Sequence, residues 1–227
     1  MKPAKDKQTE RGLTMVESMA AMVIFSLAIV SITPPIIFAM ANRVRAHRAE
    51  QAMKLAQSEI DRVRLVLERG NGAFNNLNDF VAHLPPSGGD NIEPQQVAAP
   101  TPAGASACAT PQTQGADEIC LVDVNNDGEN DFAIQTFRTL SQCLPNTSGD
   151  QVPVGFWMGV RVYTKASLDF SGGSLSKEQA SLSFSNANTA GSSPLAVRYI
   201  SIARTSIDSN SLDVYQDLAK KATGDCP

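Results

Sequence analysis

The chain has 227 residues, enough for one globular domain and an accessory segment. Hydrophobic residues make up 42% of it but aromatic residues only 6%, so the core of a globular domain must be mostly aliphatic. The formal net charge of −4 is mild and gives no indication of nucleic-acid binding.

The first long feature along the chain is an uncharged segment. Residues 18–42 are 25 consecutive residues without a charge, and as a helix they exceed the ~30 Å hydrocarbon core of a bilayer. A cleaved secretory signal has a shorter apolar stretch followed by small residues at its cleavage site. The pattern therefore favours a retained membrane helix. Basic residues lie on both sides of the segment, so the positive-inside rule does not give its orientation.

Glu17 lies at the entrance of this segment. Thr14 and Glu17 are three residues apart and fit a capping box at the start of a helix. A carboxylate that enters a membrane is costly and usually has a specific partner. Glu17 can cap the helix at one stage of assembly and pair with a partner at another.

The string Arg-Gly-Leu-Thr-Met-Val-Glu at residues 11–17 resembles the cleavage site of type IV prepilins and pseudopilins. The resemblance implies that a prepilin peptidase cuts after Gly12 on the cytoplasmic side, and that the new N-terminal residue, Leu13, is methylated. Glu17 is then the fifth residue of the mature chain, as in the family. Leu13 is the first residue after the cut, where most members of the family carry phenylalanine.

Proline twenty-two residues after the cut is also common in the family, and Pro34 is at that place. A second proline, Pro35, follows it. Each removes one helix hydrogen bond, so we expect a kink or a melted turn here. The resemblance covers about residues 8–70, and it implies the type IV pilin fold.

The resemblance also implies a route of assembly. A cut after Gly12 frees an amine four residues before Glu17, and in a fibre one subunit's amine can neutralise a neighbour's Glu17. The implied partners are the prepilin peptidase, other pilin or pseudopilin subunits, the inner-membrane assembly machinery and the lipid bilayer. The chain would cross a bacterial inner membrane once, with its head in the periplasm, and then enter a pilus or pseudopilus fibre, possibly at the cell surface.

The chain thus divides into a leader at residues 1–12, a transmembrane and assembly helix at 13–42, an amphipathic helix at 43–70 and an extracytoplasmic β-rich head at 71–227. The amphipathic helix carries one apolar stripe at alternating spacings of four and three, which predicts packing against the head. The stripe consists of Ala49, Met53, Ala56, Ile60, Val63 and Leu67. We expect the helix to stop at residues 70–72, which read Gly-Asn-Gly.

The rest of the chain reads as loops and strands. Residues 85–116 are rich in Pro, Gly, Ala, Ser, Thr and Gln and predict a long surface loop. Residues 166–193 predict a second loop around a weak strand. The strand candidates are 118–124, 131–138, 154–163, 181–185 and 195–203. A mostly antiparallel sheet laid on the amphipathic helix gives an α+β fold.

An acidic loop at residues 123–131 separates the first two strand candidates. Oxygen-bearing side chains occupy its positions 1, 3, 5 and 9, with glycine at position 6, as in DxDxDG calcium loops found between strands. The predicted structural calcium ligands are the side chains of Asp123, Asn125, Asp127 and Asp131 and the backbone carbonyl of Glu129. The alternative is a hairpin turn rich in Asn and Asp without a metal.

Four cysteines lie in the C-terminal part, at irregular spacing and with no CxxC pattern, and only two histidines accompany them. Two disulfides fit better than a zinc site, and they place this part outside the cytoplasm. Among three possible connectivities we favour Cys108–Cys120, which closes a short loop beside the acidic hairpin. The second pair is then Cys143–Cys226, and the pilin resemblance implies the same C-terminal disulfide.

No nucleophile–base pair or phosphate-binding loop is recognisable, so we do not expect an enzyme. The leading interpretation is a structural minor pilin or pseudopilin, similar to the PilV-type group, in a type IV pilus or a type II secretion-like fibre. The alternative is a calcium-dependent adhesin or binding module on a membrane anchor, which would need no cut at Gly12.

Overall fold

The computed structural model describes residues 14–69, 84–87, 92–102, 105–108, 115–145, 151–170, 174–180 and 191–203. The chain forms two compact units, Met1–Arg45 and Ala46–Pro227. The predicted strand at 181–185 lies outside the described residues, as do Gly12, Leu13 and Cys226.

The long helix α1 spans Met15–Arg69. Its start is capped by Thr14, whose Oγ1 accepts a hydrogen bond from the Glu17 amide at 3.3 Å, in agreement with the predicted N-cap. Its last residue is Arg69, and the predicted stop at residues 70–72 lies outside the described residues.

The helix is unbroken through Pro34 and Pro35, so the predicted melted turn is wrong. Proline fixes φ near the helical value, so a helix can continue through it although it loses one hydrogen bond and its ring crowds the carbonyl four residues earlier. The helical turn before the prolines keeps additional bonds, because Thr33 Oγ1 donates to the Ile29 carbonyl at 2.7 Å and Ser31 Oγ donates to the Ala28 carbonyl at 2.8 Å.

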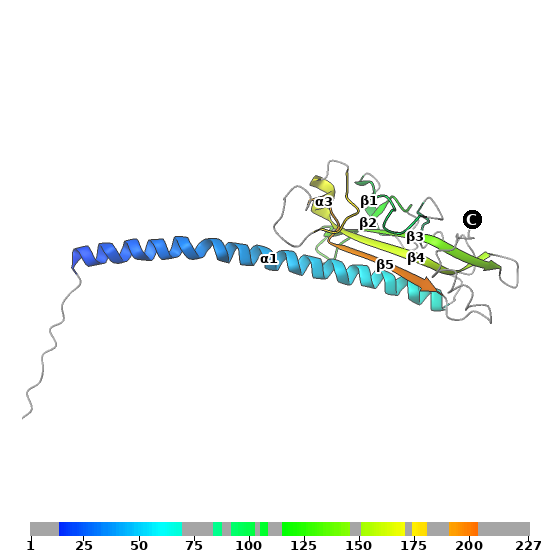
Figure 1. Ribbon diagram of the computed structural model, residues 1–227, viewed down its shortest axis with the longest axis horizontal. Coiled ribbons are helices and arrows are strands. Elements are labelled where there is room, and N and C mark those ends of the chain that lie inside the picture. The colour runs from blue at the N-terminus through cyan, green and yellow to red at the C-terminus, as the bar shows by residue number, and fades with distance from the viewer. Residues whose placement is uncertain are drawn as a thin grey trace, which may run out of the picture. The chain divides into compact units, whose positions relative to one another are not determined.

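The second unit contains a five-stranded sheet with the order β1-β2-β3-β4-β5 (Figure 1). The strands are β1 Ala105–Ala107, β2 Ile119–Val122, β3 Phe132–Pro145, β4 Gln151–Thr164 and β5 Ala196–Ala203. β1 pairs with β2 in parallel, and the other three pairs are antiparallel. The short helix α3, Lys165–Phe170, follows β4. The fold is therefore α+β with a mostly antiparallel sheet, as predicted.

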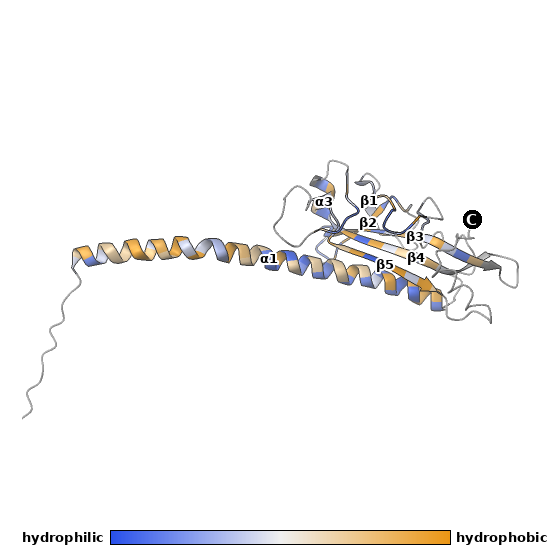
Figure 2. Ribbon diagram, in the orientation of Figure 1, coloured by the Kyte–Doolittle hydropathy of each residue, from blue (hydrophilic) through white to orange (hydrophobic). Residues whose placement is uncertain are grey.

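One face of the sheet packs on the second half of α1. The buried helix residues are Ala52, Ala56, Ile60, Val63 and Leu67. They share one core cluster with alternate residues of β4, namely Phe156, Met158, Val160 and Val162. The predicted helix stripe is confirmed except at its start, where Ala52 is fully buried and Ala49 only half-buried. Figure 2 shows how polar and apolar residues alternate along this part of α1.

The opposite face of the sheet has its own smaller core, built around Ile119, Ala133 and Tyr163. Leu168 of α3, Leu175 and the partly buried Ala99 and Ala105 cover it. Two predictions are corrected here. Residues 85–116 are more than a surface loop, because they contribute β1 and buried residues, and 166–193 contains α3. Small alanine-rich and serine-rich segments carry little periodic signal, yet they fit closely against a sheet.

Candidate membrane helix, acidic loop and disulfides

The first half of α1 exposes large apolar side chains on all sides. Phe25 is 67% exposed, Leu27 66% and Phe38 57%. The helix has a stretch with a mean hydropathy of 2.2, none of which is buried in the protein. By length and composition it can span a membrane or act as a signal sequence. An apolar surface of this extent in water is costly, so another apolar phase or partner must cover it.

Glu17 lies in the first turn of this helix, where a negative charge is favourable beside the exposed amides of the helix start. Its side chain is exposed, and within the described part of the chain no cation pairs with it. The carboxylate is therefore available to an outside partner. The predicted cleavage residues, Gly12 and Leu13, precede the described residues.

The acidic loop connects β2 and β3 and is closed by the Asp131 amide, which donates to the Val122 carbonyl at 3.0 Å. The flanking elements are strands, as predicted, and not the helices of an EF-hand. Gly128 has φ of 91° and Asn126 has φ of 58°. Glycine adopts this left-handed conformation without strain, which accounts for its place at the sixth position of the loop.

The side-chain oxygens of the loop turn toward its own backbone. Asp123 accepts hydrogen bonds from the amides of Asn126 at 2.6 Å and Gly128 at 2.8 Å. The side chains of Asn125 and Asp127 each accept from the amide two residues further on, at 3.0 and 2.8 Å. Asp131 Oδ2 accepts from the Val124 amide at 3.1 Å. The carboxylate and amide oxygens of the loop are thus bonded to its own backbone amides.

This arrangement agrees with both interpretations of the loop. Oxygen ligands are what a hard cation needs, and the observed bonds also stabilise a turn without metal. Among the residues that the structure describes, no three or more His, Cys, Asp or Glu side chains gather closely enough to hold a metal ion. A calcium ion would therefore depend on the Asn125 amide oxygen and the Glu129 carbonyl beside the carboxylates. The donor chemistry, all oxygen, fits calcium.

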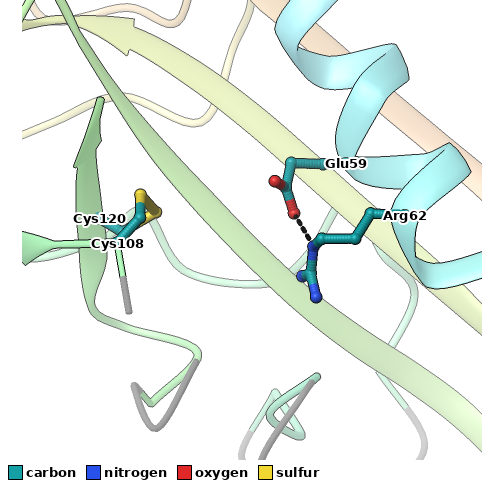
Figure 3. The surroundings of a disulfide bond; sticks show 4 residues. All are labelled: Glu59, Arg62, Cys108 and Cys120. Atoms are coloured by element: carbon teal, nitrogen blue, oxygen red, sulfur yellow. Dashed lines mark hydrogen bonds and ion pairs between the residues drawn. A yellow bond between two sulfur atoms is a disulfide. The ribbon is translucent and has the colours of Figure 1, made fainter. Parts of the chain in front are cut away.

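The structure contains the predicted disulfide Cys108–Cys120, with the two Cα atoms 4.6 Å apart. Cys120 is buried in β2, and Cys108, which is exposed, follows β1. The bond therefore fastens a three-residue edge strand to the sheet. Figure 3 shows it together with the partly buried ion pair of Glu59 and Arg62 on α1. Cys143 is also in a disulfide, and its predicted partner, Cys226, lies outside the described residues.

Sequence reasoning missed the most polar part of the interior. Arg161 of β4 is fully buried on the sheet face opposite α1. Its guanidinium donates to the backbone carbonyls of Ala98 at 2.9 Å, Val97 at 3.0 Å and Pro94 at 3.3 Å. It thereby holds residues 92–102, which we call the strap, against the sheet.

Two aromatic rings and a glycine complete the surroundings of Arg161. Its guanidinium carbon lies 5.0 Å from the centre of the Phe137 ring and 5.7 Å from that of Tyr199, a favourable geometry for a cation. Phe137 lies directly over Gly159, its partner across the β3–β4 pair. A lone arginine in an alternating strand gives no signal of burial, because the pattern assigns it to the polar face.

No protein-family model, curated protein or solved structure matches this chain. The class is therefore defined by architecture alone. A long apolar N-terminal helix, with its second half packed on a mixed sheet, is a pilin-like architecture.

Proposed function

We propose that this chain is a structural subunit, a minor pilin or pseudopilin, of a type IV pilus or a related secretion fibre. One observation carries the proposal: an exposed apolar helix of membrane-spanning length continues into a helix that packs on a mixed β-sheet. Such a helix needs lipid or neighbouring helices around it. In a subunit that moves from a membrane into a fibre, lipid surrounds this helix first and neighbouring helices surround it afterwards. Such a subunit needs no catalytic site.

In this proposal a prepilin peptidase removes residues 1–12, and the inner-membrane assembly machinery moves the mature subunit into the fibre. Disulfides in the second unit support a periplasmic location for it. Mass spectrometry of the mature N-terminus tests the cut after Gly12, with Leu13 as the expected first residue. A mature protein that begins at Met1, or one that is cut after residue 40, would contradict the proposal.

Glu17 tests the assembly step. In a fibre of packed helices, an unpaired neighbouring amine in a low-dielectric environment is costly. We expect Glu17→Ala to insert into membranes normally but to be depleted from sheared fibres. Ser18→Ala is the matched control, because Ser18 is also exposed in the first turn and its hydroxyl donates to the Met15 carbonyl of its own helix. Equal incorporation of both variants would refute the role of Glu17.

A bound calcium ion is the second part of the proposal, and the spacing of oxygen-bearing side chains around Gly128 in the acidic loop supports it. A ligand that binds only the folded state at a hundredfold excess over its Kd stabilises that state by about 2.7 kcal/mol. At about 2–4 °C per kcal/mol for a unit of this size, calcium should raise the melting temperature of the full chain in detergent by about 5–10 °C.

Asp127→Ala should remove most of this calcium effect, whereas Glu178→Ala, an exposed acidic residue outside the loop, should leave it intact. Magnesium should substitute poorly, because it prefers a smaller octahedral site. If melting curves with calcium and with a chelator superimpose, the loop is a turn and not a metal site.

The acidic loop also favours one alternative function, a calcium-dependent adhesin held by a membrane anchor. A plain anchor needs no processing. A chain that keeps residues 1–12 and binds calcium would support the adhesin, whereas a chain that begins at Leu13 would support the fibre subunit.

A further inference from the structure

Two successive prolines leave one backbone carbonyl of α1 without a donor in its own helix. A helical carbonyl accepts from the amide four residues later, or from the amide three residues later in a tighter turn. For the Ser31 carbonyl these positions are Pro35 and Pro34, and neither has an N–H. The Val30 carbonyl, which also faces a proline, can still share the amide of Thr33. Because the helix continues unbroken through both prolines, the Ser31 carbonyl is an acceptor that α1 does not satisfy.

The hydroxyl groups of the uncharged segment do not satisfy this carbonyl either. A Ser or Thr side chain can donate to a carbonyl that a proline has freed. The two nearest hydroxyls, those of Ser31 and Thr33, donate instead to carbonyls one turn earlier, at 2.8 and 2.7 Å. The other two, at residues 18 and 26, also donate to carbonyls of their own helix. Since a hydroxyl has one hydrogen to donate, all four are already used.

Asn42 carries the only side-chain N–H donors of residues 18–42, and its carboxamide has two of them. The side chain is exposed, and within the described part of the chain nothing hydrogen-bonds to it. An apolar phase offers no water to a free carbonyl, so its donor must come from another polypeptide. The uncharged segment thus holds one unsatisfied acceptor, the Ser31 carbonyl, and one side chain with unused donors, Asn42.

The two groups cannot meet within one chain, but they lie on the same side of the helix. Asn42 follows Ser31 by 11 residues, which is ~16 Å along the axis and three full turns with a remainder of ~20°. Helical carbonyls point toward the C-terminal end, and side chains lean toward the N-terminal end. Two copies of the helix that lie side by side can therefore join these groups when they are offset along the axis by ~16 Å or somewhat less.

We propose that the Asn42 carboxamide of one copy of this chain donates to the Ser31 carbonyl of a second copy. This inference rests on the proposed function, because it requires a fibre in which copies contact one another through α1. Two copies that span a bilayer at the same depth have no axial offset, so the contact does not form between them. It forms once one copy has advanced relative to the other, and it therefore favours the fibre over the bilayer.

The test measures how much of each variant enters sheared fibres when it is expressed beside the wild-type chain. Asn42→Leu keeps the size of the side chain and removes the donors, and Pro35→Ala supplies the missing amide to the Ser31 carbonyl. Each should be incorporated about three- to tenfold less than the wild type. The double variant should be no worse than either alone, because both changes remove the same contact. Pro34→Ala is the matched control, since its amide lies four residues after Val30 and leaves the Ser31 carbonyl without its regular donor.

Position 38 reports the axial offset, because it lies between the two groups and within ~20° of Ser31 around the helix. With p-benzoylphenylalanine in place of Phe38, irradiated fibres should give crosslinks to about residues 27–30 of a second copy. Copies at equal depth in a membrane would instead crosslink near residue 38. Fibre crosslinks only near residue 38, or only to a different protein, would overturn the proposal.

The outcomes separate the contact from the proposed function. Incorporation of Asn42→Leu at the wild-type level would refute the contact and leave the fibre subunit standing. A loss in Pro34→Ala as large as that in Pro35→Ala would also refute it, because the effect would then come from the shape of the helix. If the wild-type chain itself is absent from sheared fibres, the proposed function fails, and the contact fails with it.

Discussion

Arg161 offers the sharpest test of how the second unit is held together. We expect Arg161→Met to lower the free energy of unfolding by about 3–5 kcal/mol. The side chain is fully buried, and it donates to the carbonyls of Pro94, Val97 and Ala98 of the strap. Gln135 of β3 accepts from the guanidinium at 3.1 Å and itself donates to the Ala98 carbonyl at 3.2 Å. The Arg161 Nε also donates to the Tyr199 hydroxyl at 3.1 Å.

The magnitude follows from what methionine leaves behind. A hydrogen bond to a charged group contributes about 1.5–3 kcal/mol net, and a buried carbonyl that loses its donor costs about 1–3 kcal/mol. The desolvation of the guanidinium, which opposes folding in the wild type, is removed as well. For that reason the expected loss of stability in Arg161→Met is smaller than the summed contributions of three separate hydrogen bonds. At about 2–4 °C per kcal/mol the melting temperature should fall by about 6–20 °C.

The assay is urea or thermal unfolding of the full chain in detergent. Arg198→Met is the matched control, because Arg198 of β5 is exposed and its Nε donates to the Met53 sulfur at 3.0 Å. It should change stability by no more than about 0.5 kcal/mol. Arg161→Lys should fall between the two, because one ammonium group cannot reach all three carbonyls. A loss for Arg161→Met no larger than that for Arg198→Met would refute the reasoning.

Three further outcomes follow from the second unit. A Cβ at Gly159 would lie 2.3 Å from Phe137 Cζ, so Gly159→Ala should cost about 1–3 kcal/mol in urea unfolding, and Phe137→Leu in the same chain should recover part of it. Burial raises the pKa of Tyr163 above 10.0. Its contribution to stability is therefore complete below pH 10.0 and is lost as the pH rises further, and Tyr163→Phe should reduce this alkaline loss in a pH series of melting curves. Replacing Cys108 and Cys120 by serine opens a loop with a sequence separation of 12 and should cost about 3 kcal/mol by calorimetry. A smaller loss than in Cys108→Ser alone would contradict this expectation.

The sequence predicted the elements whose side chains repeat with a regular period. In β4 the alternation of Phe156, Met158 and Val160 identifies the buried face, since a sheet packed on a helix needs a period of two. The stripe on the second half of α1 has the helical period for the same reason. The acidic loop was recognisable because its glycine and its oxygen side chains occupy fixed positions in a turn.

Elements defined by tertiary fit were not predictable in this way. The strand candidate at 131–138 continues in the structure to Pro145, through an irregular register after Thr139 in which Leu140 has φ of 48°. A buried leucine in a left-handed conformation has no sequence signature, because most leucines avoid it. The sequence of β1 also lacks a pattern that predicts a strand, since three small residues form one only where β2 and the disulfide hold them.

Arg161 shows why the candidate sites were only partly predictable. The positions of Glu17, the acidic loop and the cysteines depend on local spacing, which the sequence contains. The buried arginine depends on backbone carbonyls from a segment more than sixty residues earlier, and no pattern in β4 indicates them. A charge in a strand is assigned to the solvent face unless its partners are known, and here the partners have no side-chain signature.

The two halves of α1 differ in what surrounds them, and alanine substitutions can measure this difference. Ala56 is fully buried in the core cluster with β4, so the helix and sheet meet there with room only for a methyl group. Ala56→Leu should therefore cost about 1–3 kcal/mol in urea unfolding through overpacking. Ala21 lies exposed in the uncharged segment, where leucine adds apolar surface that lipid accepts. Ala21→Leu should leave the unfolding of the second unit unchanged and keep the chain in the membrane fraction. If Ala56→Leu were tolerated as well as Ala21→Leu, the close packing of the second half of α1 on the sheet would be wrong.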